Sequence, residues 1–221
     1  MTRTPRSELP HAVLWDMDGT LVDTEPAWIA GEFRLAERHG GTWSEDHALN
    51  LVGNDLLTSA TYIREHMGID LSPEQIVDAL LDHVVEEVRR TVPWRPGALD
   101  LLLSHVEAGI PAALVTMSYR RFAQAVIDSL PDDTFSAIVV GDEVDNGKPH
   151  PEPYLAAAAL LGADPANCLA IEDSGPGATS AEAAGCHVLV VPNHVEVATG
   201  PRRTRRDSLV GLEVSDLGAF W

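Results

Sequence analysis

Short apolar runs and helical patterns alternate along most of the chain, in the order typical of a layered α/β protein. The apolar runs predict buried strands at 12–15, 112–115, 137–140, 168–171 and 187–191. The helical patterns that follow residue 97 are at 98–106, 121–130, 153–161 and about 178–184. Near-continuous apolar strands are needed where helices cover both faces of a parallel sheet. The alternation therefore predicts an α/β fold with a doubly wound parallel sheet.

The stretch between Pro26 and Pro96 breaks this rhythm. It contains three helical patterns and no strand pattern of useful length. The three patterns are at 26–39, 55–67 and 73–92. We therefore expect a helical cap domain over 26–96, inserted into an α/β core formed by 1–25 and 97–221, with the flanking prolines as hinges.

Composition and charge narrow the setting. The 221 residues include 34 acidic and 15 basic side chains, a formal charge of −19, which argues against binding to nucleic acid or an anionic membrane. No apolar stretch approaches the roughly 18 residues of a membrane span, and the first ten residues lack the pattern of a signal peptide. We expect a soluble cytoplasmic protein, and a monomer by default because the sequence shows no dimer seam.

Two smaller features have simple interpretations. Cys168 and Cys186 each flank an apolar run, so we expect small buried hydrophobic residues and no disulfide framework. The basic cluster Arg202–Arg206 is expected to be a solvated loop.

The first candidate for chemistry is the pair Asp16 and Asp18, directly after the apolar run 12–15. Residues two apart on an extended chain point the same way, so both carboxylates are expected to project from the end of this strand. Carboxylates held so close repel each other, raise a pKa, or need a cation between them. This arrangement is typical of a Mg²⁺-dependent phosphoryl-transfer enzyme.

Two further groups each follow a predicted strand. Thr116-Met117-Ser118 offers hydroxyl and backbone N–H groups that suit a phosphate oxygen, and the same residues equally suit a helix N-cap. Lys148 is the only lysine in a chain with fourteen arginines. Its compact charge on a flexible stem suits a phosphate that also contacts a metal and a carboxylate.

The last group is the acidic pair Glu172-Asp173, after the apolar run 168–171. One of the pair can bind Mg²⁺ directly while the other acts through water; alternatively, Asp173 or Ser174 only caps the next helix. Ligands bind at the carboxyl ends of strands in an open parallel sheet. All four groups are therefore expected to converge on one site.

Taken together, these residues resemble the haloacid dehalogenase superfamily over nearly the whole chain. The family's Asp-x-Asp-Gly-Thr strand end is matched by Asp16 to Thr20. Its Ser or Thr after the next core strand is matched by Thr116, its Lys before a Pro-rich helix start by Lys148, and its acidic pair by Glu172-Asp173. The resemblance implies a Rossmann-like core, and the insertion at 26–96 is similar to the family's small α-helical cap.

The resemblance also implies roles for these residues. Asp16 would attack phosphorus to form an aspartyl-phosphate, and Asp18 would first protonate the leaving alcohol and then deprotonate the hydrolytic water. Mg²⁺ would be bound by Asp16, the backbone carbonyl of Asp18 and Asp173, with Glu172 contributing through water. Lys148 would offset negative charge. The phosphoryl oxygens would be bound by Thr116, by Ser118 and by backbone N–H groups of Met17, Asp18 and Met117.

Differences between branches of the family narrow the activity. Asp18 argues against dehalogenation, because departure of a halide needs no protonation. The expected cap contains no lysine, which excludes the Schiff-base chemistry of phosphonoacetaldehyde hydrolases. β-Phosphoglucomutases carry a His where this chain has Trp28, and an Arg where it has Gly53-Asn54-Asp55-Leu56.

We therefore expect a phosphatase for a small phosphorylated metabolite, with Trp28, Gly53 and Asn54 facing the substrate. For Trp28, packing within the cap is an equally good interpretation. Sugar phosphates, polyol phosphates and phosphoglycolate all remain open as substrates. A phosphomutase and a catalytically silent ligand-binding protein remain as alternatives.

Overall fold

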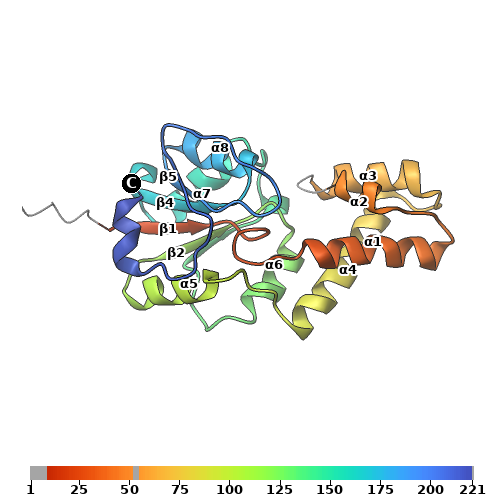
Figure 1. Cartoon of the computed structure of the whole chain (residues 1–221), viewed down its shortest axis with the longest axis horizontal. Coiled ribbons are helices and arrows are strands. Elements are labelled where there is room, and N and C mark those ends of the chain that lie inside the picture. The colour runs from red at the N-terminus through yellow and green to blue at the C-terminus, as the bar shows by residue number, and fades with distance from the viewer. Residues whose placement is uncertain (1–8, 52–54, 221) are drawn as a thin grey trace, which may run out of the picture. The chain divides into compact units, whose positions relative to one another are not determined.

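The computed structural model describes residues 9–51 and 55–220, and its described residues form two compact units (Figure 1). The sheet unit consists of the described residues up to Val22, of 94–117, and of those from Pro131 onward. The helical unit consists of the described residues within 23–93 and of 118–130.

The sheet unit is built on six parallel strands in the order β3-β2-β1-β4-β5-β6. The strands are β1 (Ala12–Trp15), β2 (Ala112–Val115), β3 (Ala137–Val139), β4 (Cys168–Glu172), β5 (His187–Val190) and β6 (Arg203–Arg205). The chain order reverses between β1 and β4, which lie side by side at the centre of the sheet. The doubly wound parallel sheet expected from the sequence is confirmed, and ligands bind at such a reversal point.

Helices cover both faces of this sheet (Figure 1). The helical segments of the sheet unit are α5 (Ala98–Glu107), η1 (Gly141–Glu143), α7 (Glu152–Leu160), η2 (Pro165–Asn167), α8 (Gly175–Ala184) and η3 (Val214–Ala219). Side chains of β1 alternate between the faces. Leu14 lies in the core shared with α7 and α8, whereas the Trp15 indole N–H donates to His105 of α5 over 2.9 Å. Burial lowers the pKa of His105 to about 4, so this pair is neutral.

The helical unit contains α1 (Glu25–His39), α2 (Glu45–Leu49), α3 (Leu56–Met67), α4 (Pro73–Arg90) and α6 (Arg120–Ile127). α4 is its central element, and it packs against α1, α3 and α6. It begins with a capping box, in which Ser72 and Gln75 each accept a hydrogen bond from the other's backbone N–H. Its buried residues recur at helical spacing: Ile76, Val77, Leu80, Leu81, Val84, Val85 and Val88.

The structure differs from the sequence-based expectations in three places. The expected boundaries of 26–96 differ from the observed units: 23–25 and 118–130 belong to the helical unit, where α6 packs against α4, and 94–96 belong to the sheet unit. α2 was not expected; it is only five residues long. The basic cluster is not simply a loop, since its middle forms the edge strand β6, and Arg203 is paired with Glu182 over 2.9 Å.

The expectation for the two cysteines is confirmed. Cys168 and Cys186 are free and buried, as the sequence predicts. Within 9–51 and 55–220, we find no helix with both the length and the apolar character needed to cross a bilayer.

Candidate active site

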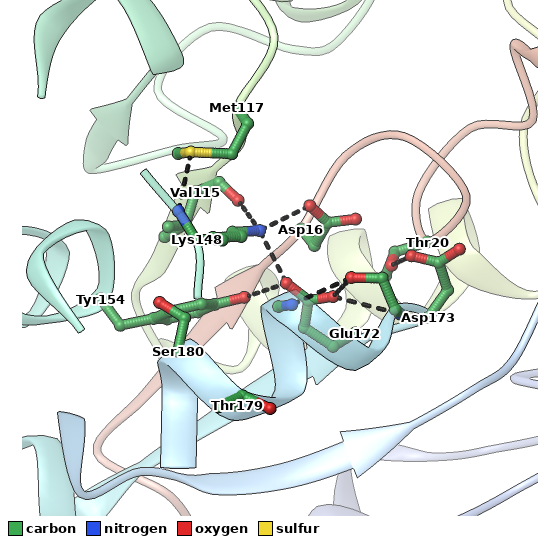
Figure 2. Close-up of polar contacts among 12 residues, drawn as sticks. Asp16, Thr20, Val115, Met117, Lys148, Tyr154, Glu172, Asp173, Thr179 and Ser180 are labelled. Atoms are coloured by element: carbon green, nitrogen blue, oxygen red, sulfur yellow. Dashed lines mark hydrogen bonds and ion pairs between the residues drawn. The ribbon is translucent and has the colours of Figure 1, made fainter. Parts of the chain in front are cut away.

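Lys148 is the centre of a buried cluster at the carboxyl edge of the sheet (Figure 2). Its ammonium donates to Asp16 Oδ1 over 2.7 Å, to the Val115 carbonyl over 2.8 Å and to Glu172 Oε1 over 2.6 Å. These acceptors lie at the ends of β1, β2 and β4. Only 5% of the side chain is exposed. All three ammonium hydrogens therefore have a partner, and the charge is fixed between two carboxylates.

Glu172 is the last residue of β4 and is fully buried. Besides Lys148, its Oε1 accepts from the Tyr154 hydroxyl over 2.7 Å, and its Oε2 accepts from the Ser174 hydroxyl over 3.0 Å. A Cβ added to Gly177, in the first turn of α8, would overlap the carboxylate. Glu172 is thus enclosed by hydrogen-bond donors and by the backbone of α8.

Asp173 contacts the turn that follows β1. The Thr20 hydroxyl donates to its Oδ1 over 3.2 Å. A Cβ on Gly19 would overlap its carboxylate, and Gly19 also has a φ of +85°, which disfavours any other residue. Glycine at this position therefore allows Asp173 to pack directly on the turn that contains Asp18.

Electrostatics and hydrogen bonding both indicate a cation at this cluster. Burial and repulsion by Glu172 raise the pKa of Asp16 to about 7, and burial and repulsion by Asp16 and Glu172 raise that of Asp173 to about 8. Oxygens of Asp16, Glu172 and Asp173 lie within 4.8 Å of one another. Asp16 Oδ2 is buried and has no hydrogen-bond partner among the described residues. One lysine does not balance three carboxylates, and the unpartnered oxygen fits a divalent cation.

The structure places the other predicted core residues as follows. Asp18 is half-buried in the turn after β1, and its charge contributes to the raised pKa of Asp16. The Met17 side chain is fully buried, and its carbonyl accepts from the backbone N–H groups of three residues of the turn. The side chain is therefore not available to a ligand, and binding of a phosphoryl oxygen by the backbone N–H of Met17 stays a prediction.

Thr116 is buried directly after β2. Met117 Sδ accepts the backbone N–H of Lys148 over 3.2 Å, so Met117 supports the loop that carries the lysine. Ser118 is half-buried and belongs to the helical unit. The capping alternative fails here, because the N-cap of α6 is Tyr119 and no side chain caps it. A helix cap is observed at Ser174, whose hydroxyl accepts a hydrogen bond from the Gly177 N–H at the start of α8 over 3.1 Å.

The cap residues are placed only in part. Trp28 lies on α1, and its ring meets that of Phe122 edge-on at 5.7 Å within the helical unit. Packing within the unit, one of the two interpretations of Trp28, is therefore observed. Gly53 and Asn54 lie outside the described residues.

Sequence reasoning missed Tyr154, which contacts the cluster directly (Figure 2). The position of Tyr154 could have indicated this contact, because it lies six residues after Lys148, in the first turn of a helix whose buried face covers the sheet. An alanine-rich helix gives no direct indication that its one aromatic residue donates to a carboxylate.

A parallel α/β sheet with a buried lysine, a candidate cation site and paired carboxylates at its carboxyl edge defines a class of protein, the phosphoryl-transfer enzymes that act by positioning and electrostatics. The sequence model of the haloacid dehalogenase-like hydrolase family matches residues 10–185 of this chain. The chain belongs to this family.

Similar proteins agree with this assignment. The chain is 31% identical to hexitol phosphatase B of Escherichia coli K12, over 97% of this chain and 98% of that protein. It is 36% identical to hexitol phosphatase A of the same organism, over 80% and 81%. The crystal structure of CbbY from Rhodobacter sphaeroides in complex with phosphate superposes with a TM-score of 0.81 at 26% identity, and covers 92% of this chain and 96% of that one. The family and fold predicted from the motifs are therefore confirmed.

Proposed function

We propose that this protein is a Mg²⁺-dependent phosphatase that hydrolyses a small phosphorylated metabolite through an aspartyl-phosphate at Asp16. The observation that carries the proposal is the state of the Asp16 carboxylate. One of its oxygens is held by Lys148 over 2.7 Å, while the other is buried and without a partner among the described residues. The carboxylate is thereby fixed in position and little solvated, as a nucleophile in phosphoryl transfer requires, and its two oxygens allow one to bind a cation while the other attacks.

Each step of the reaction uses residues of this cluster. An Asp16 oxygen forms a bond to phosphorus as the ester P–O bond breaks, and Asp18 gives its proton to the departing alkoxide. Water then attacks the aspartyl-phosphate and loses a proton to Asp18. Inorganic phosphate leaves and the Asp16 carboxylate is restored. Lys148 offsets the negative charge of Asp16 and of the transferred group, and the Thr116 hydroxyl binds a phosphoryl oxygen.

A bound Mg²⁺ supplies the positive charge that the carboxylate cluster lacks. Glu172 already accepts from Lys148, Tyr154 and Ser174. These hydrogen bonds favour Asp16 and Asp173 as the side chains that bind the ion directly, with Glu172 acting through water as the motif implies.

The names of the relatives support a substrate class. Two proteins that cover most of the chain are named hexitol phosphatases, and one from Thermotoga maritima, 31% identical over 79% of this chain, is named phosphorylated carbohydrates phosphatase. We propose sugar phosphates and polyol phosphates as the substrate class of this protein.

The test is phosphate release from a panel of sugar phosphates, polyol phosphates and phosphoglycolate, with and without Mg²⁺. Wild type is expected to hydrolyse members of the first two groups, and Asp16→Asn to lose activity. Asp132→Asn, a matched change at an exposed residue, should keep it. Wild-type rates in Asp16→Asn would contradict the mechanism. Isomerisation of a sugar phosphate without phosphate release would indicate a mutase. Mg²⁺ binding without any turnover would indicate a catalytically silent binding protein.

A further inference from the structure

Tyr154 is a buried polar residue that the proposed reaction does not use. It lies on α7, and its side chain is fully buried. Its hydroxyl donates to Glu172 Oε1 over 2.7 Å, and Lys148 Nζ lies 5.1 Å from the centre of its ring (Figure 2). The hydroxyl and the lysine therefore meet at the same carboxylate oxygen.

This shared oxygen determines where the lysine charge lies. Glu172 Oε1 accepts from both Lys148, over 2.6 Å, and Tyr154, over 2.7 Å. A hydrogen bond to a buried carboxylate withdraws negative charge from it and is stronger than one between neutral groups. Without the hydroxyl, the charge on Oε1 would be balanced by Lys148 alone on that side. The ammonium would then be drawn toward Glu172 and away from Asp16.

The surroundings leave Glu172 no other way to compensate. Its second oxygen accepts from Ser174 over 3.0 Å, and the backbone at Gly177 closes the remaining side. The carboxylate is fully buried, so bulk solvent is not available beside Tyr154 to replace a lost donor to Oε1. Loss of the tyrosine hydroxyl therefore has to be absorbed by the bond between Glu172 and Lys148.

We propose that Tyr154 is a positioning residue, whose hydroxyl holds Glu172 so that Lys148 stays bonded to Asp16. The inference about the geometry is independent of the reaction, and its effect on turnover rests on the proposed function. If Tyr154 only filled space in the core, phenylalanine would replace it without any change at the lysine.

The chain offers a direct spectroscopic test because Lys148 is its only lysine. Protein labelled with ¹³C,¹⁵N-lysine gives one set of side-chain NMR signals, all from this site. Tyr154→Phe keeps the ring beside Nζ and removes only the hydroxyl. We expect the Lys148 Nζ and Cε signals of Tyr154→Phe to shift by more than their linewidths. Tyr62→Phe, which removes a hydrogen-bonded hydroxyl from the helical unit, should leave them unchanged.

Turnover provides the second readout. Loss of one hydrogen bond to a charged group corresponds to about a tenfold change in rate, so kcat of Tyr154→Phe should fall about tenfold while KM changes less than about twofold. In a Glu172→Gln background, Tyr154→Phe should cause no further shift of the lysine signals, because the shared charge is gone.

The outcomes separate the two proposals. Lysine signals of Tyr154→Phe that coincide with those of wild type would overturn the positioning role, whatever the activity. A shift in a protein that hydrolyses no phosphate ester would support the positioning role and contradict the proposed function. If Tyr154→Phe does not fold, the Glu172→Gln protein tests the inference instead. Lysine signals of Glu172→Gln that coincide with those of wild type would show that Glu172 does not position Lys148, and would overturn the inference.

Discussion

Glu32 in the helical unit gives a prediction whose size follows from the structure. It lies on α1 and is only 5% exposed, and the Trp43 indole N–H donates to its Oε2 over 2.9 Å. Burial raises its pKa from 4.5 to about 7, despite the hydrogen bond from Trp43. Folded protein therefore holds this carboxyl protonated at pH values where the unfolded chain has released the proton.

The sign of the effect follows from the two protonation states. Below about pH 4.5 both states are protonated, and Glu32 costs no stability. Between about pH 4.5 and 7 the folded state binds more protons than the unfolded one, so the free energy of unfolding falls as pH rises. Above about pH 7 Glu32 is ionised in both states, and its effect on the free energy of unfolding does not change further. A difference of 2.5 pKa units at 1.36 kcal/mol each corresponds to about 3 kcal/mol as an upper value.

Glu32→Gln removes this penalty and keeps an acceptor for Trp43. Urea unfolding should show the variant more stable than wild type by about 1–3 kcal/mol at pH 8, and equal to it within error at pH 4. Glu37→Gln, an exposed change on the same helix, controls for net charge. Equal gains for the two variants at pH 8, or a Glu32→Gln gain that does not depend on pH, would refute the reasoning.

Three further predictions concern the active site. Gly177→Ala should abolish phosphatase activity, because the added Cβ would overlap the Glu172 carboxylate. Gly175→Ala should keep the activity, because its Cβ meets no atom within 4 Å, and phosphate release compares the two variants. Lys148→Met should destabilise the protein by about 3–5 kcal/mol in urea at pH 8, because it leaves buried carboxylates without their partner; no loss would contradict the buried ion pair. Mg²⁺ should raise the melting temperature of wild type by occupying the carboxylate cluster, and Asp173→Asn should remove most of that rise; an equal rise in both would place the ion elsewhere.

Much of the sheet was predictable because each strand is a short apolar run. Five of the six strands lie where the pattern places them, since a strand covered on both faces has little room for polar residues. β6 was missed because its sequence, Arg203 to Arg205, is charged. It lies at the edge of the sheet, where one side pairs with β5 and ion pairs accommodate the arginines.

The convergence of the charged residues was also predictable, and the reason is topological. Asp16 follows β1, Glu172 ends β4 and Lys148 lies in the connection after β3, and parallel strands bring their carboxyl ends to one edge. The structure joins these three directly. The roles assigned to them in catalysis stay predictions.

The sequence did not indicate the residues that hold this cluster. Tyr154 and Gly177 act through contacts made after α7 and α8 pack on the sheet, and neither belongs to a charged motif. The assignment of α6 to the helical unit was missed for the same reason. Its apolar face fits either a sheet or another helix, and only the tertiary packing decides between them.

The central claim is tested most directly by trapping the covalent intermediate. Wild-type protein would be mixed with Mg²⁺ and a substrate found in the panel, quenched within milliseconds and treated with borohydride, which reduces an acyl phosphate but not a free carboxylate. Mass spectrometry of the peptide that contains Asp16 should show conversion of that residue to homoserine, only when substrate is present. An unmodified Asp16 under conditions of rapid turnover, or modification of a different residue, would contradict the account.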